Sequence, residues 1–308
     1  MGKSAVLLII RIQKGLFDVK LKVCEVSKRY DSKVLDGISF EVDQGIVGLL
    51  GENGAGKTTL MEIIATLARP DTGKVEYDGK ERDEDLYAIR RRIGYLPQKF
   101  DFFAKISVEE ALDYFCRLKH ISSPEERKRE IEEKLVQVGL IEHRKKQFGA
   151  LSGGMKQRVG IAQAMIGDPA LLLVDEPTVG LDPHERAAFR QLLSELAADR
   201  VVLLSTHIVE DIAMTSERLL VLHEGRVNYY GDLSTFIRSV EGKVWMYRGP
   251  SVPESLRRRP SLILSSQATA EGVEVRYIAE TPIERSVPVE PTLEHAYMYA
   301  NRKRTDYE

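Results

Sequence analysis

Apolar residues in this chain gather in short runs that alternate with segments of helical periodicity. Three of these runs are apolar almost throughout, which is typical of strands buried on both faces of a parallel sheet, and they lie at residues 46–50, 171–174 and 201–205. Helical patterns follow at residues 57–67, where Arg69-Pro70 is a stop signal, and after Asp182-Pro183. A short strand is expected at residues 74–77, between two glycine turns. The alternation predicts an α/β domain.

Between about residues 96 and 154 helical patterns replace the strand signals, which indicates an inserted helical subdomain. The segments 107–110 (SVEE) and 123–126 (SPEE) are both expected to form capping boxes at helix starts. Beyond residue 231 the pattern predicts a small α+β extension, with a helix near 233–240, strands at 243–247, 262–265 and 273–277, and a final helix around 292–301. We therefore expect a lead-in at residues 1–20, a main domain at 21–230 and an accessory extension at 231–308.

Composition and charge further restrict the class of protein. The 308 residues carry 45 Lys and Arg against 47 Asp and Glu, and this net charge of −2 does not favour nucleic acid, whose binders usually present a basic face. Cys24 and Cys116 lie far apart and lack the spacing of metal ligands, which suits a reducing compartment. The apolar run at residues 5–10 is too short to cross a bilayer, and we interpret it as an extra strand or an irregular start. A function at a membrane would therefore need another chain to supply the membrane part.

Residues 51–58 (GENGAGKT) match the phosphate-loop pattern G-x-x-x-x-G-K-[ST], between a predicted strand and a predicted helix. Glycines let the backbone N–H groups of such a loop converge on phosphates, and the helix start adds the positive end of its dipole. We expect Lys57 to reach the β- and γ-phosphates and Thr58 to be a ligand of Mg²⁺. The pattern therefore predicts a nucleotide site.

Two carboxylates follow the predicted strand at residues 171–174. Asp175 and Glu176 are expected at the carboxyl edge of the sheet, where open α/β sheets bind ligands. We expect Asp175 to hold Mg²⁺ through water and Glu176 to polarise the attacking water. The alternative interpretation, two surface acids after a strand, does not account for the phosphate loop.

A second candidate anion site lies at residues 151–158 (LSGGMKQR). The Ser152 hydroxyl and the N–H groups of Gly153 and Gly154 open a predicted helix that runs to about residue 166, so they can bind an anion by the same physics. Taken alone, the same residues are more typical of a simple helix cap, because helices often begin after glycine. One chain thus carries two phosphate-binding patterns about a hundred residues apart.

These motifs, in this order over about residues 20–230, resemble the nucleotide-binding subunit of ABC transporters. GENGAGKTT is similar to the family's Walker A motif, LLLVDEP to its Walker B motif and LSGGMKQR to its signature motif. The resemblance implies a P-loop NTPase core with an antiparallel β subdomain and a helical subdomain, all within a cassette at residues 21–230. It also implies a set of ATP contacts at Tyr30, Gly51, Asn53, Gly54, Gly56, Lys57, Thr58, Thr59, Ser152, Gly153, Gly154 and Asp182.

The resemblance also implies a specific role for each of four further residues. Tyr30 corresponds to the aromatic residue that stacks on adenine, and Gln98 in GYLPQ to the Q-loop glutamine that senses Mg²⁺ and water and faces the membrane subunit. Asp182 matches the D-loop and also suits the cap of the following helix. His207 matches the histidine that contacts the γ-phosphate. The implied catalytic residues are Glu176, His207, Gln98 and Lys57, and the implied magnesium ligands are Thr58, Gln98 and Asp175.

The resemblance also implies partners. ATP and Mg²⁺ would join two copies of the chain head to tail, each lending its Ser152 to the nucleotide on the other's phosphate loop. A separate membrane permease would hold this dimer at the cytoplasmic face of the cell membrane. Residues 224–245 (EGRVNYYGDLSTFIRSVEGKVW) and 288–302 (PVEPTLEHAYMYANR) resemble the ATPases of bacterial type-2 exporters, which implies export.

Three other functions compete with this interpretation. A soluble ABC-type ATPase acting on ribosomes or DNA would usually show two cassettes or a long coiled-coil insertion, and a basic face. A regulatory nucleotide binder would not need Glu176, Gln98 and His207 together. A P-loop kinase would leave LSGGMKQR unexplained.

Overall fold

The apolar runs form the centre of a six-stranded sheet with strand order β10-β9-β3-β8-β7-β6. Its members are β3 (Ile46–Leu50), β6 (Ile93–Leu96), β7 (Leu171–Asp175), β8 (Val201–Thr206), β9 (Arg218–His223) and β10 (Arg226–Asp232). Strands β3, β7 and β8 are buried at every residue, and β8 pairs in parallel with both neighbours. Their carboxyl ends therefore reach the same edge of the sheet, which is the edge where ligands bind in such folds.

The computed structural model describes residues 20–301. The apolar run at residues 5–10 lies outside the described residues, as does all of the predicted lead-in except Lys20. The chain divides into two compact units between Val227 and Asn228. Among the described residues, no helix is both long and apolar enough to pass through a bilayer.

A second sheet in the first unit is antiparallel, with strand order β2-β1-β4-β5. Its strands are β1 (Leu21–Arg29), β2 (Lys33–Val42), β4 (Thr72–Tyr77) and β5 (Lys80–Glu81). Strand β2 passes beside the phosphate loop. The carbonyl oxygen of Val34, on this strand, lies within van der Waals reach of Gly56 in the loop. The sheet thereby supports one wall of the loop.

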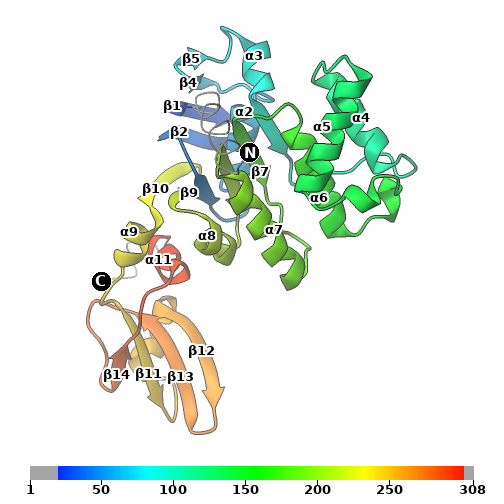
Figure 1. Ribbon diagram of the computed structural model, residues 1–308. Coiled ribbons are helices and arrows are strands. Elements are labelled where there is room, and N and C mark those ends of the chain that lie inside the picture. The colour runs from blue at the N-terminus through cyan, green and yellow to red at the C-terminus, as the bar shows by residue number, and fades with distance from the viewer. Residues whose placement is uncertain (1–19, 302–308) are drawn as a thin grey trace, which may run out of the picture. The chain divides into compact units, whose positions relative to one another are not determined.

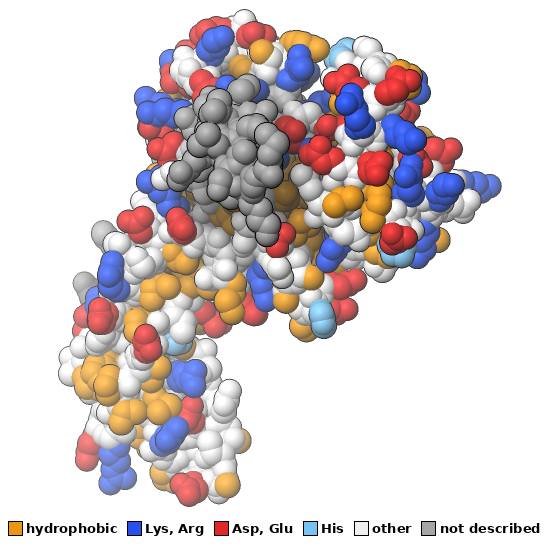
Figure 2. Space-filling view, in the orientation of Figure 1, with side chains coloured by type: hydrophobic (Ala, Val, Ile, Leu, Met, Phe, Trp, Pro, Cys, Tyr) orange, Lys and Arg blue, Asp and Glu red, His pale blue; other side chains and the backbone are white. Residues whose placement is uncertain are grey.

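Helices cover the sheets and form the inserted subdomain (Figure 1). Their bounds are α2 (Lys57–Ile64), α3 (Leu86–Arg91), α4 (Val108–Leu118), α5 (Pro124–Gln137), α6 (Gly153–Met165), α7 (Pro183–Leu196) and α8 (Val209–Thr215), with 3-10 turns at Ile141–His143 and Phe148–Ala150. Helices α4, α5 and α6 pack on one another, and α6 also packs on β6. Figure 2 shows side chains of both charges mixed over these helices.

Two predicted helix ends need correction. Helix α2 ends at Ile64 rather than at residue 67, because the Tyr77 hydroxyl on β4 caps the Ile64 carbonyl (2.5 Å) and Thr66 turns the chain with a positive φ of 63°. Ser107 forms the predicted capping box at α4. At α5 only the serine half forms: the Ser123 hydroxyl accepts from the N–H of Glu126, but the Glu126 side chain does not bond the Ser123 N–H.

The second unit is built on a four-stranded sheet with strand order β12-β13-β11-β14. Its elements are α9 (Leu233–Arg238), β11 (Val244–Gly249), α10 (Glu254–Arg257), a 3-10 turn at Pro260–Leu262, β12 (Ile263–Thr269), β13 (Gly272–Ile278), β14 (Ser286–Pro288) and α11 (Leu293–Ala300). Val275 and Tyr277 are fully buried in its small core. The strand predicted at 262–265 extends to Thr269, because its pairing with β13 continues to the turn at Gly272.

Candidate functional site

The phosphate loop joins β3 to α2 and depends on the conformational freedom of two glycines. Gly54 and Gly56 have φ angles of 86° and 100°, a region that residues with a Cβ rarely adopt. A Cβ at Gly56 would also lie 2.8 Å from the Val34 carbonyl oxygen. The loop leads into α2, whose first N–H groups have no partner within the helix and are available to phosphates.

The predicted phosphate contacts lie around this loop. Gly51 and Gly56 are buried, Asn53, Gly54 and Thr58 are exposed, and Thr59 is half-buried in the first turn of α2. Lys57 is buried and its Nζ donates to the carbonyl oxygens of Gly51 (2.7 Å) and Glu52 (3.2 Å). The lysine is thus held at the mouth of the loop by two backbone acceptors.

Asp175 ends β7 and is fully buried. Its Oδ1 accepts a hydrogen bond from the Ser205 hydroxyl (2.7 Å), while its Oδ2 is buried with no hydrogen-bond partner in the described part of the chain. Burial raises the pKa of this carboxyl, and the neighbouring hydroxyl groups of Ser205 and Thr58 act in the opposite direction. A buried carboxylate oxygen without a donor favours a further partner, since an unpaired buried polar atom is costly.

Glu176 is the next residue and lies between two other predicted site residues. Its Oε2 is 2.7 Å from His207 Nδ1, and its Oε1 is 3.2 Å from Lys57 Nζ. The backbone of Glu176 has a positive φ of 48°, and its N–H donates to the Ser205 carbonyl oxygen (2.9 Å). The strained turn aims the carboxylate across the loop instead of continuing the strand.

Three of the four predicted catalytic side chains therefore meet at one edge of the sheet. The fourth, Gln98, is exposed just beyond β6, where Leu96 pairs with Val174 next to Asp175. Gln98 thus follows a neighbouring strand at the same edge, and it forms no hydrogen bond with the other three among residues 20–301. His207 directly follows β8, and its side chain is 42% exposed.

Tyr30 lies just past β1 and is 55% exposed, so it is not a core residue. The Nζ of Lys28 lies 5.4 Å from the centre of its ring. The exposed ring is available for stacking on a flat ligand.

A second group contains the other predicted residues. Ser152 is the N-cap of α6, and its Oγ accepts from the N–H of Met155 (3.2 Å). Asp182 is the N-cap of α7, and its Oδ1 accepts from the N–H of Glu185 (2.8 Å). The Glu185 carboxylate connects the two helix starts, because its Oε1 lies 3.5 Å from Ser152 Oγ.

Gly153 and Gly154 complete this second group. Gly153 is exposed, whereas Gly154 is buried beneath Glu185, whose Oε1 would be 2.5 Å from a Cβ at position 154. Sequence reasoning missed Glu185. Its only signal is its place three residues after the capping Asp182, which indicates a local helix start and not a contact with residue 152.

Sequence reasoning also missed a buried network behind Glu176. The Asp211 carboxylate is 1% exposed and accepts from the Thr178 hydroxyl (2.5 Å) and from Arg190 (2.9 Å). Thr178 follows Glu176 by two residues, and Asp211 lies on α8, which follows His207. The network therefore joins the segments that carry the glutamate and the histidine.

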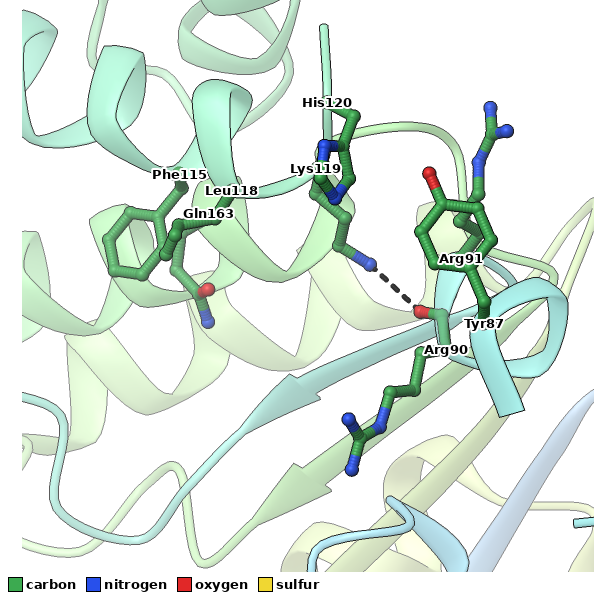
Figure 3. Close-up of a pocket in the computed structure, with 8 residues that line it drawn as sticks. All are labelled: Tyr87, Arg90, Arg91, Phe115, Leu118, Lys119, His120 and Gln163. Carbon is green, nitrogen blue, oxygen red and sulfur yellow. Dashed lines mark hydrogen bonds between the residues drawn. The ribbon is translucent and has the colours of Figure 1, made fainter. Parts of the chain in front are cut away.

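A pocket of about 350 Å³ opens beside β6, on the face shown in Figure 3. Its lining residues come from α3, from α4 and the residues after it, and from α6, and they are Tyr87, Arg90, Arg91, Phe115, Leu118, Lys119, His120 and Gln163. Lys119 Nζ donates to the carbonyl oxygens of Arg90 (3.1 Å) and Ile93 (3.0 Å). Burial, with a smaller contribution from Arg91, lowers the pKa of Lys119 to about 8.

Comparison with known proteins agrees with this geometry. A family model described as "ABC transporter" matches residues 35–179. The daunorubicin resistance ATP-binding protein DrrA3 of Streptomyces coeruleorubidus is 38% identical over 68% of this chain and 67% of its own length. The Nod factor export ATP-binding protein I of Burkholderia orbicola (strain AU 1054) is 34% identical over 90% of this chain and 92% of its own length.

A solved structure supports the same assignment. The ATP-binding cassette MJ0796, in a dimeric post-hydrolysis state bound to ADP and Pi, superposes with a TM-score of 0.63 at 28% identity, covering 69% of this chain and 98% of its own. The chain belongs to the ATP-binding proteins of ABC transporters. It is a transporter subunit that binds and hydrolyses ATP, which confirms the predicted fold class and activity.

Proposed function

We propose that this subunit powers export through a separate membrane permease, with ATP held between two copies of the chain. The observation that carries the proposal is the Glu176 carboxylate, which contacts both Lys57 and His207 beside the phosphate loop. A water molecule attacking the γ-phosphate needs a nearby base, and a cation must meet the charge that develops on the phosphate. These three side chains, from three separate segments, offer both.

In the proposed cycle the loop N–H groups and Lys57 bind the β- and γ-phosphates, while Tyr30 stacks on adenine. When Lys57 engages phosphate, it releases its contact with Glu176, and the carboxylate is then free to accept a proton from the attacking water. His207 holds the carboxylate in place with its Nδ1 2.7 Å from Glu176 Oε2, and we assign to it the contact with the γ-phosphate. The remaining loop contacts are assigned to Gly51, Asn53, Gly54, Gly56 and Thr59.

The residues around Asp175 suit a magnesium ion. Its unpartnered Oδ2, the exposed Thr58 hydroxyl and the Gln98 side-chain oxygen are the hard oxygen donors that Mg²⁺ prefers. We assign these three residues to it, with Asp175 acting through water. When bound, the ion would neutralise phosphate charge.

The second group of residues supports a composite site. Ser152, Gly153, Gly154 and Asp182 lie at the starts of α6 and α7. The described side-chain hydrogen bonds of Ser152 and Asp182 are with Met155 and Glu185 and not with Lys57 or Glu176. A helix start with a serine cap suits a phosphate, and the similar cassette MJ0796 is a dimer. We infer that a second copy, packed head to tail, delivers its nucleotide to this group.

Export and the permease rest on the relatives and on the pocket beside β6. The two relatives bear names of drug resistance and of Nod factor export. The pocket is lined by apolar and cationic side chains, among them Arg91 and Lys119, and an acidic residue inserted there would relieve the repulsion between these two cations. We assign the pocket to a permease segment with apolar and acidic side chains, which would place this subunit at the cytoplasmic face of the membrane.

Replacing Glu176 with glutamine tests the proposal. The Glu176→Gln chain should retain ATP, hydrolyse it at least about 100-fold more slowly than the parent, and accumulate as a dimer with Mg-ATP. Steady-state turnover and light scattering after size exclusion measure these outcomes. Glu142→Gln, at an exposed position, is the control and should behave like the parent. Parental turnover together with a monomer in the Glu176→Gln chain would disprove the role of Glu176.

A further inference from the structure

We propose that the Glu185 carboxylate is a built-in anion at the start of α6 that opposes the γ-phosphate delivered there by a second copy. The residue would thereby set the ATP concentration at which two copies associate. This inference rests on the proposed function, because it needs ATP to bridge two chains. It concerns a residue that none of the sequence motifs contains.

The geometry places the Glu185 carboxylate beside the start of α6, where the phosphate is proposed to bind. Its Oε1 lies 3.5 Å from Ser152 Oγ, and Oε1, Cδ and Oε2 would lie 2.5, 2.7 and 3.2 Å from a Cβ at Gly154. The carboxylate therefore rests on the backbone of the first turn of α6, against the serine and one of the glycines assigned to phosphate. A Cβ at position 154 would displace the carboxylate from this place.

Electrostatics makes the Glu185 carboxylate unfavourable for a γ-phosphate that binds at the same helix start. The first turn of α6 carries partial positive charge, so it stabilises one nearby anion. A γ-phosphate that arrives at the same turn meets the charge of Glu185, and like charges this close repel. ADP lacks the γ-phosphate, so the penalty falls on the ATP-bound dimer alone.

Glu185 also transmits the arrival of phosphate to α7. Its N–H is held by the Asp182 side chain (2.8 Å), so its backbone and side chain join the starts of α6 and α7. A phosphate that displaces the carboxylate from Ser152 would free one side of this connection. The other interpretation is that Glu185 only braces the two helices, and it predicts the opposite outcome when the charge is removed.

The experiment uses the full chain carrying Glu176→Gln, so that ATP is bound without being consumed. Analytical ultracentrifugation at fixed protein concentration gives the Mg-ATP midpoint for dimer formation, with and without Glu185→Gln. Loss of the charge should lower this midpoint about fivefold, as expected for an interaction of about 1 kcal/mol at a helix start. The effect should shrink as salt is raised, because salt screens exposed charges.

Two further variants test whether the effect depends on the charge at position 185 and not on the shape of its side chain or on the charge of α7 in general. Glu185→Ala should also lower the midpoint, while Glu195→Gln, which removes a carboxylate from the same helix at a site paired with Gln191, should leave it unchanged. An unchanged or raised midpoint in both Glu185 variants, with folding intact by thermal unfolding, would overturn the inference. If the Glu176→Gln chain forms no dimer at all with Mg-ATP, the proposed composite site fails first, and this inference fails with it.

Discussion

Gly54 and Gly56 both have left-handed backbone angles, but only Gly56 is packed against another part of the chain. A Cβ at Gly54 would meet nothing within 4 Å, whereas at Gly56 it would lie 2.6 Å from Leu35 Cδ2 and 2.8 Å from the Val34 carbonyl oxygen. The first glycine therefore serves backbone conformation alone. The second also allows β2 to approach the phosphate loop.

This difference predicts unequal effects of the same substitution. Gly54→Ala should cost about 1–2 kcal/mol of unfolding free energy, the usual penalty for a Cβ in this conformation. Gly56→Ala should cost roughly 1–3 kcal/mol more, because the backbone of β2 must also shift. Urea unfolding of the two variants measures the difference. Equal losses would show that the contact with Val34 has no consequence for stability.

Motifs predicted the residues that lie near the ends of buried strands. Lys57, Glu176 and His207 are far apart in sequence, yet parallel strands bring their ends to one edge. The pattern predicted Glu176 beside the phosphate loop, and the resemblance to the family supplied His207. Ser205 and Glu185 could not be predicted in this way. Their roles depend on where a side chain points across a gap between two elements, and no local pattern encodes that direction.

At the scale of elements, α7 and α8 are held together by the charge of Asp211. Its carboxylate is buried and contacts Arg190 from α7 and Thr178 from the segment after Glu176. Glu210, the neighbouring residue on α8, lies 3.7 Å from the same arginine but is largely exposed. The two acids therefore share a partner and differ mainly in burial.

Asp211→Asn should destabilise the chain by about 2 kcal/mol, because it leaves the partly buried Arg190 without its close counter-charge. The value lies below that for fully buried pairs, since Arg190 keeps some contact with water and with Glu210. Glu210→Gln is the matched control and should cost at most about 0.5 kcal/mol. Chemical unfolding compares them, and similar losses in both would contradict a special role for the buried carboxylate.

The sequence predicted the existence of these elements better than their ends. Buried strands and the inserted helices were correct because their apolar spacing reflects one dominant force, burial. Helix α2 stops early because a tyrosine from β4 caps it, and the capping box at α5 is incomplete because the Glu126 side chain does not return to the Ser123 N–H. Both outcomes depend on where side chains point, which the local pattern does not encode.

At the scale of the whole molecule, the two groups of site residues imply that one chain is incomplete. In the proposed function the first group binds and cleaves the nucleotide, and the second offers a helix start that the first does not contact. Two copies arranged head to tail would complete two sites, as symmetry requires. This is the central claim of the proposed function.

Mixing two inactive variants tests that claim most directly. Lys57→Ala disables the phosphate loop, and Ser152→Asp keeps a helix cap while placing a negative charge where phosphate should bind. Each variant alone should be nearly inactive, and an equimolar mixture should recover about a quarter of the parental ATPase rate, because half the dimers are mixed and each holds one intact site. A mixture no more active than the average of the two separate variants would contradict a site shared between two copies.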